Sequence, residues 1–262
     1  MELTGNTHLY AILGHPVGHI RAPVFFNEKF AALRLDSHLV VFHLHPDELA
    51  DVVPLLPKVR NLRGLIVTIP HKPAMAALCD ELGPSGRLIG TVNTVRFDPG
   101  GRLVGDMFDG LGLIAGARAN GIEMAGKRVL LVGAGGAGRA IAFAIAQEGA
   151  ASLTIANRTA ATGEAVAAQV AAAVDGADVR FGPADPADHD VIVNATSLGL
   201  HDGDPMPVDP DALTGAMEVI DIIAPLTPFQ TAVAARGIKL MGGRPMIDHQ
   251  IEAQMRFMGE EW

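Results

Sequence analysis

The stretch "KRVLLVGAGGAGRAIAFAIAQEGA", residues 127–150, decides the fold class of this chain. An apolar run is followed at once by a glycine-rich turn, and then by apolar residues at helical spacing, which predicts a strand, a tight turn and a helix. Gly133, Gly135 and Gly138 give the turn the pattern G-x-G-x-x-G. Between a strand and a helix, this pattern is typical of a dinucleotide-binding turn, although an ordinary glycine-rich turn is the alternative.

Each position of the turn has an expected role. Gly133 permits the tight turn, Gly135 lets a pyrophosphate approach the backbone, and Gly138 lets the helix pack closely against the strand. Amide groups at the start of the helix, from Gly136 and Ala137, would face the phosphate charge. These five residues are therefore the expected pyrophosphate contacts.

The next strand, "SLTIANR" (152–158), bears on the choice of nicotinamide cofactor. An NAD site usually ends this strand with Asp or Glu, which holds the ribose hydroxyls. Here the strand ends in Asn157, Arg158 and Thr159. Arg158 can pair with a 2′-phosphate and Thr159 can donate a hydrogen bond to it, so we expect NADP(H), with NAD as the alternative. Arg158 could also be a solvated loop cation.

Composition limits the other classes of function. The net charge of −9 argues against a nucleic-acid-binding surface, and no apolar run is long enough for a membrane span. The single cysteine, Cys79, rules out an internal disulfide and a cysteine-based zinc cluster, and the scattered histidines predict no metal site. The first residues, "MELTGNTHLY", lack the layout of a signal peptide, so we expect a cytoplasmic protein.

Strand-like and helix-like runs alternate along all 262 residues, a length typical of two domains. We expect an N-terminal α/β substrate domain, residues 1–108 plus 241–262, and a doubly wound parallel-sheet (Rossmann) domain, residues 109–240. The runs expected to be strands are 8–14, 38–44, 64–70, 91–98, 101–106, 127–133, 152–158, 179–181, 190–196, 217–223 and 237–243. Those expected to be helices are 23–34, 46–59 with a break near Pro54, 72–82, 109–120, 136–150, 159–174 and 246–258.

A lysine follows one of the apolar strands. In "GLIVTIPHK" (64–72), Lys72 comes two residues after the proline that ends the strand. It is either a general acid or base at a cleft or a solvated first-turn residue. In "GDMFDG" (105–110), Asp109 stands where the two predicted domains meet, and ligand clefts are common at such boundaries. Asp109 could hold the lysine ammonium, or it could be the N-cap of the following helix.

Several motifs, in the same order along the chain, resemble the shikimate dehydrogenase family. They are "GHPVGH" (14–19), "VTIPHK" (67–72), "GTVNTV" (90–95), "GDMFDG" (105–110), "GAGGAG" (133–138), "NRT" (157–159), "NATSLGL" (194–200) and "MIDHQ" (246–250). The resemblance implies NADPH-dependent reduction of 3-dehydroshikimate, with Lys72 and Asp109 as the catalytic pair. It implies that Asn93 and Gln250 bind ring hydroxyls and that Thr68 lines the pocket. It also adds cofactor contacts at Thr196, Ser197, Gly243 and Met246.

The substrate motifs depart from that family in four places. The two serines of its first loop are replaced in "HIRAP" (19–23), an asparagine is replaced by Ile66, and Asn-Thr before the aspartate is replaced by "MF" (107–108). A tyrosine is also absent from "DIIAPLTP" (221–228). Each change removes a hydrogen-bonding side chain.

We therefore expect the same reaction type on an altered, shikimate-like hydroxy acid, carried out by a monomer or homodimer. Arg21 could replace the serines as a carboxylate anchor, which would make the protein a true shikimate dehydrogenase. It could instead point to solvent. A third hypothesis is a non-catalytic NADP(H)-binding sensor.

Overall fold

The computed structural model describes residues 3–201 and 203–262, and the chain divides into two compact units. Unit 1 comprises residues 1–108 and 250–262, and unit 2 comprises residues 109–249. The chain returns to unit 1 at Gln250, later than the expected residue 241. The reason is local packing: Gly243 N donates to Ile223 O at 3.2 Å, and the backbone at Pro245 and Met246 lies against Gly116.

The sheet of unit 1 has six strands in the order β2-β1-β3-β5-β6-β4. Strands β2, β1 and β3 are parallel, whereas β5 is antiparallel to both β3 and β6, and β4 is parallel to β6. The short ribbon predicted around "PGG" is therefore confirmed as the β5–β6 pair. The strands are β1 (His8–Gly14), β2 (Ser37–His43), β3 (Leu62–Val67), β4 (Glu81–Leu82), β5 (Thr94–Phe97) and β6 (Leu103–Asp106).

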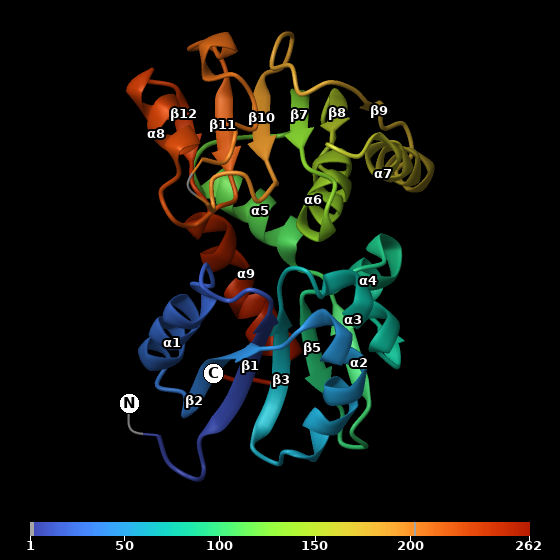
Figure 1. The fold of residues 1–262 in the computed structure, drawn as a ribbon, viewed down its shortest axis with the longest axis vertical. Coiled ribbons are helices and arrows are strands. Elements are labelled where there is room, and N and C mark those ends of the chain that lie inside the picture. Colours follow the sequence, from blue (N-terminus) through green and yellow to red (C-terminus); the bar gives the residue numbers. More distant parts are fainter. Residues whose placement is uncertain (1–2, 202) are drawn as a thin grey trace. The chain divides into compact units, whose positions relative to one another are not determined.

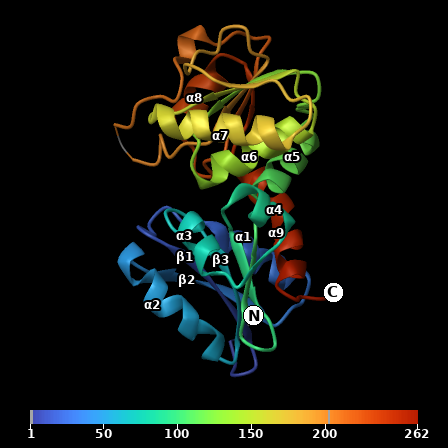
Figure 2. The same ribbon diagram turned by 90° about the vertical axis from the view of Figure 1, so that its right-hand side faces the viewer.

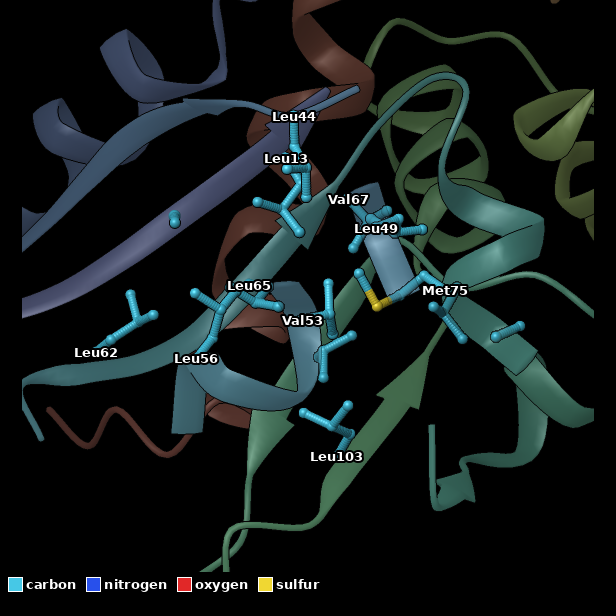
Figure 3. Packing of buried hydrophobic residues seen from close by; sticks show 14 residues of the cluster. Leu13, Leu44, Leu49, Val53, Leu56, Leu62, Leu65, Val67, Met75 and Leu103 are labelled. Atoms are coloured by element: carbon cyan, nitrogen blue, oxygen red, sulfur yellow. The ribbon is translucent and has the colours of Figure 1, made fainter. Parts of the chain in front are cut away.

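Helices cover both faces of this sheet (Figure 1). Alternate residues of β1 point to opposite faces. Leu13 joins Leu49 and Met75 in the core shown in Figure 3, on the side of α2 and α3. Tyr10, on the other face, stacks on Phe30 of α1 with ring centroids 5.6 Å apart. The helices are α1 (Ala22–Ala32), η1 (Pro46–Glu48), α2 (Leu49–Val52), η2 (Val53–Lys58), α3 (Lys72–Leu78), α4 (Pro84–Ile89) and the end of α9 (Arg244–Phe257).

The sheet of unit 2 has six parallel strands in the order β12-β11-β10-β7-β8-β9. The chain builds outward from β7 in one direction and from β10 in the other, so the strand order reverses between these two neighbours. This is the doubly wound order of dinucleotide-binding folds, and the predicted fold class is confirmed. The strands are β7 (Arg128–Val132), β8 (Ser152–Ala156), β9 (Val179–Phe181), β10 (Val191–Asn194), β11 (Glu218–Asp221) and β12 (Lys239–Met241).

The four central strands of unit 2, β8, β7, β10 and β11, are buried on both faces, which explains their largely apolar sequences. Phe229 and Val233 of α8 pack with Leu130 and Val219 on one face. Helices α5, α6 and α7 lie together in front of the sheet in Figure 2. No described helix is long and apolar enough to cross a membrane. The helices of this unit are α5 (Asp109–Ala119), α6 (Gly136–Gln147), α7 (Ala160–Ala173), η3 (Pro210–Ala212) and α8 (Pro228–Ala235).

Candidate active site

The glycine turn lies between β7 and α6. Gly133 has φ +107°, a value that side-chain-bearing residues rarely adopt, and a Cβ there would stand 2.8 Å from the Ala195 carbonyl oxygen. A Cβ on Gly138 would overlap the Gly133 carbonyl oxygen. The first and third glycines are therefore required by the protein's own packing, because strand, turn and helix approach too closely for a side chain.

Gly135 differs from its two neighbours in the pattern. A Cβ at Gly135 would meet no protein atom within 4 Å, and its φ of −73° and ψ of −167° suit any residue. The protein's packing therefore does not explain this glycine, whereas a phosphate approaching the backbone would. Gly135 is the N-cap of α6, whose first amides, at Gly136 and Ala137, have no partner within the helix. The residues present fit a dinucleotide pyrophosphate.

The end of β8 adjoins this turn. Asn157 Oδ1 accepts a hydrogen bond from Ala134 N at 3.1 Å, and Asn157 Nδ2 donates to Thr159 O at 2.9 Å. Asn157 therefore ties the glycine turn to the next loop. Arg158 and Thr159 are exposed, and the Thr159 hydroxyl does not cap α7 although Thr159 is its N-cap residue. Their binding of the cofactor stays a prediction.

The other expected cofactor residues follow the carboxyl ends of β10 and β12. The Thr196 hydroxyl donates to Asn194 Oδ1 at 2.7 Å and accepts from Leu198 N at 3.1 Å, and Ser197 is exposed. Gly243 follows β12, and a Cβ on it would overlap the Ile222 carbonyl oxygen. Met246, in the first turn of α9, is buried.

In unit 1, the loop after β3 carries two expected residues. Thr68 is half-buried, and its backbone N donates to Leu13 O at 3.0 Å, which holds the loop against the end of β1. Lys72 is the first residue of α3, and only 8% of it is exposed. Its carbonyl oxygen accepts from Val92 N at 3.2 Å, so the residues before β5 pack on the start of α3. The lysine is thus largely removed from water.

Asn93 and Gln250 are brought together, although 157 residues separate them in the sequence. Asn93 Nδ2 donates to Gln250 Oε1 at 3.0 Å. Asn93 Oδ1 accepts from Phe108 N and from the Thr94 hydroxyl, each at 3.0 Å. The donors fix the orientation of the buried Asn93 amide, because its oxygen must face the two donors and its nitrogen must face Gln250.

Arg21 and Asp109 complete the expected set. Arg21 is exposed at the N-cap of α1, and its side chain makes no capping hydrogen bond. Asp109 is the first residue of α5 and is buried, with 4% exposed. A carboxylate in the first turn of a helix interacts favourably with the helix dipole. Lys72 belongs to unit 1 and Asp109 to unit 2, and their pairing stays a prediction.

Histidines gather where β1, β2 and β3 end. His15 Nδ1 and His43 Nε2 lie 3.0 Å apart, and the rings of His15 and His45 are 4.9 Å apart. His71 is buried and hydrogen-bonded to Leu44 O at 2.9 Å. Within the described part of the chain, no group of three or more His, Cys, Asp or Glu side chains could hold a metal ion.

Sequence reasoning missed a buried polar network at the carboxyl end of β11. Asp221 accepts hydrogen bonds from Asn194, Thr227 and Gln230. A signal was present in "TPFQ" (227–230), since Thr-x-x-Gln with proline at the first helical position marks a helix start. Recognising this start would have placed Thr227 and Gln230 at the N-terminus of α8, but not their hydrogen bonds to Asp221.

Comparisons with known proteins identify relatives that span nearly the whole chain. Residues 12–95 match the family model described as shikimate dehydrogenase substrate binding domain, and residues 115–200 match that of shikimate / quinate 5-dehydrogenase. A shikimate dehydrogenase (NADP(+)) of Rubrobacter xylanophilus is 36% identical over 98% of this chain and 93% of that protein.

Two solved structures extend the comparison. A shikimate dehydrogenase in complex with NADP+ has a TM-score of 0.90 and 28% identity, and covers 98% of this chain and 92% of its own. A ligand-free 5-ketofructose reductase of Gluconobacter sp. has a TM-score of 0.81 and 30% identity, covering 98% and 94%. The resemblance predicted from the motifs is confirmed, and the chain belongs to the shikimate dehydrogenase family.

Proposed function

We propose that this protein is an NADP-dependent dehydrogenase that interconverts a ring alcohol and its ketone, on a substrate related to shikimate but less polar. The observation that carries the proposal is Gly135, at the N-cap of α6, where a Cβ would meet no protein atom within 4 Å and the backbone is open to a pyrophosphate. The named relatives support NADP as that dinucleotide. When bound, NADP(H) supplies or accepts the hydride.

Lys72 is proposed as the group that exchanges the proton of the substrate hydroxyl. Its burial at the start of α3 limits the water that could compete with a substrate oxygen for the proton. In the oxidative direction the amine accepts or relays the hydroxyl proton, and in reduction the ammonium returns it. Asp109 would hold the ammonium, and Asn93 with Gln250 would bind neighbouring hydroxyls.

The residues of the loop "HIRAP" (19–23) are the basis for proposing an altered substrate preference. Ile20 and Ala22 stand where the family carries two serines that bind the substrate carboxylate, and Ile20 reaches the space beside Gly14 and Thr68. Losing two hydrogen bonds to a carboxylate weakens selection for an acid strongly. The 5-ketofructose reductase shows that this fold also occurs with a different named activity.

A second candidate function is shikimate dehydrogenase itself. It is favoured by Arg21, whose guanidinium is exposed and is not used to cap α1. Arginine pairs with carboxylates through two parallel hydrogen bonds, and so could replace two hydroxyls. Under this alternative, R21A raises KM for shikimate by at least tenfold, whereas under the lead proposal shikimate is a poor substrate before and after the change.

The test is a screen of shikimate, quinate and less polar ring alcohols with NADP+, following NADPH absorbance. We expect activity with at least one alcohol, and weak turnover of shikimate. K72A should lower kcat by about a hundredfold to ten-thousandfold while NADPH affinity changes little. The matched control is K58A, which removes an exposed lysine from η2, at the opposite end of β3. Full activity in K72A would reject the lysine assignment, and efficient turnover of shikimate would reject the altered preference.

A further inference from the structure

The carboxyl end of β11 carries a carboxylate that the proposed proton transfer does not use. Asp221 is fully buried and lies opposite Asn194, the last residue of β10, in the parallel register. Its Oδ1 accepts from Asn194 Nδ2 at 3.0 Å and from Ile223 N at 3.1 Å. Its Oδ2 accepts from the Thr227 hydroxyl at 2.9 Å and from Gln230 Nε2 at 3.2 Å. We name Asn194, Asp221, Thr227 and Gln230 the Asp221 hub.

Each bond of the hub fixes a different loop at this edge of the sheet. Asn194 Oδ1 accepts from Thr196 N at 3.1 Å and from the Thr196 hydroxyl, so holding the Asn194 amide also holds the turn after β10. Thr227 Oγ1 accepts from Gln230 N at 3.1 Å, which begins α8 and ends the loop after β11.

The third loop is joined through a shared carbonyl. Gln230 Nε2 donates to Ile223 O at 2.8 Å, and the same oxygen accepts from Gly243 N at 3.2 Å. The loops after β10, β11 and β12 therefore depend on one carboxylate. Removing it would leave several buried polar groups without partners at once.

These loops lie on one side of the point where the strand order reverses. A dinucleotide bound in a doubly wound sheet crosses that point, with its pyrophosphate at the glycine turn. Asn157, Arg158 and Thr159 follow β8, on the adenosine side. The hub therefore underlies the opposite half of the site. Contact with the turn is direct, because a Cβ on Gly133 would stand 2.9 Å from Thr196 Cγ2.

We propose that Asp221 is a positioning residue, which sets the three loops that receive the nicotinamide half of NADP(H). This inference rests on the proposed function. An ionised carboxylate can only accept hydrogen bonds, so it fixes which way the Asn194 and Gln230 amides point. Burial raises the pKa of Asp221, and the four hydrogen bonds oppose that change.

The test compares two ligands that differ in the nicotinamide half. NADPH spans the whole site, whereas 2′,5′-ADP contains only the adenosine half. D221N keeps the shape of the side chain but sets an amide donor against Gln230 Nε2. We expect D221N to weaken NADPH binding by about tenfold, with 2′,5′-ADP affinity unchanged. T227V, which removes one donor to the carboxylate, should give the same selective loss if D221N does not fold.

The matched control is T154V, which removes a buried hydroxyl from β8 that is hydrogen-bonded to His189. It should lower thermal stability and leave both affinities unchanged. The inference would be overturned if the hub variants lost affinity for both ligands equally, or lost affinity for neither. If the unaltered protein bound neither ligand, the proposed function itself would fail instead.

Discussion

The glycine turn gives the sharpest prediction, because alanine at its second and third glycines should have opposite effects on stability. G135A adds a methyl group that meets no protein atom within 4 Å, at backbone angles that alanine adopts freely. The unfolded chain loses conformational freedom, so we expect the unfolding free energy to rise by about 0.4–1 kcal/mol. G138A places its methyl group on the Gly133 carbonyl oxygen, a backbone atom that cannot rotate away.

Overpacking of this kind costs roughly 1–3 kcal/mol, which lowers Tm by several degrees in a domain of this size. For NADPH binding, the harmful substitution should be G135A, although it does not destabilise the protein. In G135A the methyl group keeps the pyrophosphate from the backbone amides, and each lost hydrogen bond to a charged group is worth about 1.5–3 kcal/mol. NADPH affinity should therefore fall by roughly tenfold to a hundredfold in a protein that is at least as stable as the original.

The assay pairs thermal melting with a fluorescence titration of NADPH for each variant. G215A is the matched control, because Gly215 is also an exposed glycine of unit 2 whose Cβ would meet nothing within 4 Å. G215A should not lower Tm, and it should leave NADPH affinity unchanged. Tight NADPH binding by G135A would falsify the assignment of this turn to the pyrophosphate, and an unchanged Tm in G138A would contradict the packing argument.

Two further predictions concern titrating groups in unit 1. Burial raises the pKa of the Cys79 thiol to about 12, so iodoacetamide should label the native protein at pH 8 roughly a thousandfold more slowly than a free thiol; labelling at the free-thiol rate would refute this. Burial lowers the pKa of His71, so below about pH 6.5 the unfolded chain binds a proton that the native protein does not, and stability falls as the pH drops. Between pH 7.5 and 5.5, the urea midpoint of unfolding should therefore fall less in H71Q than in the unaltered protein. Equal falls in the two proteins would count against a buried neutral imidazole at His71.

Most elements of the fold could be predicted, because apolar spacing reports the local hydrogen-bonding pattern directly. The helix expected at 46–59 illustrates the limit: the α-helical part ends at Val52, and Pro54 lies in the 3-10 turn that follows. Val53, just before Pro54, keeps α-helical angles, but Pro54 has no backbone N–H to donate to the preceding turn, so the α-helical hydrogen bonds stop there. The predicted break near Pro54 was therefore right. Helices α4 and α8 were missed, because each is short and opens with proline in a segment rich in turn-forming residues.

The candidate site was predictable where its residues are neighbours along the chain. The glycine turn and the end of β8 follow strands, and the parallel sheet brings their carboxyl ends to one edge. Apolar replacements such as Ile20 were also visible in the sequence, since they are changes of residue type. The directions of the amides were not, because an amide has both donor and acceptor atoms and only its neighbours decide which one is used.

The sequence by itself determined the alternation of strands and helices, the dinucleotide turn and the family. Only the tertiary structure decided that Asn93 bonds Gln250 and that one carboxylate, Asp221, serves three loops. The physical reason is the range of the interactions. Periodicity and turn chemistry act over a few residues and leave a pattern in the chain, whereas a buried polar network forms only after distant segments have packed and must then satisfy every donor and acceptor enclosed with it.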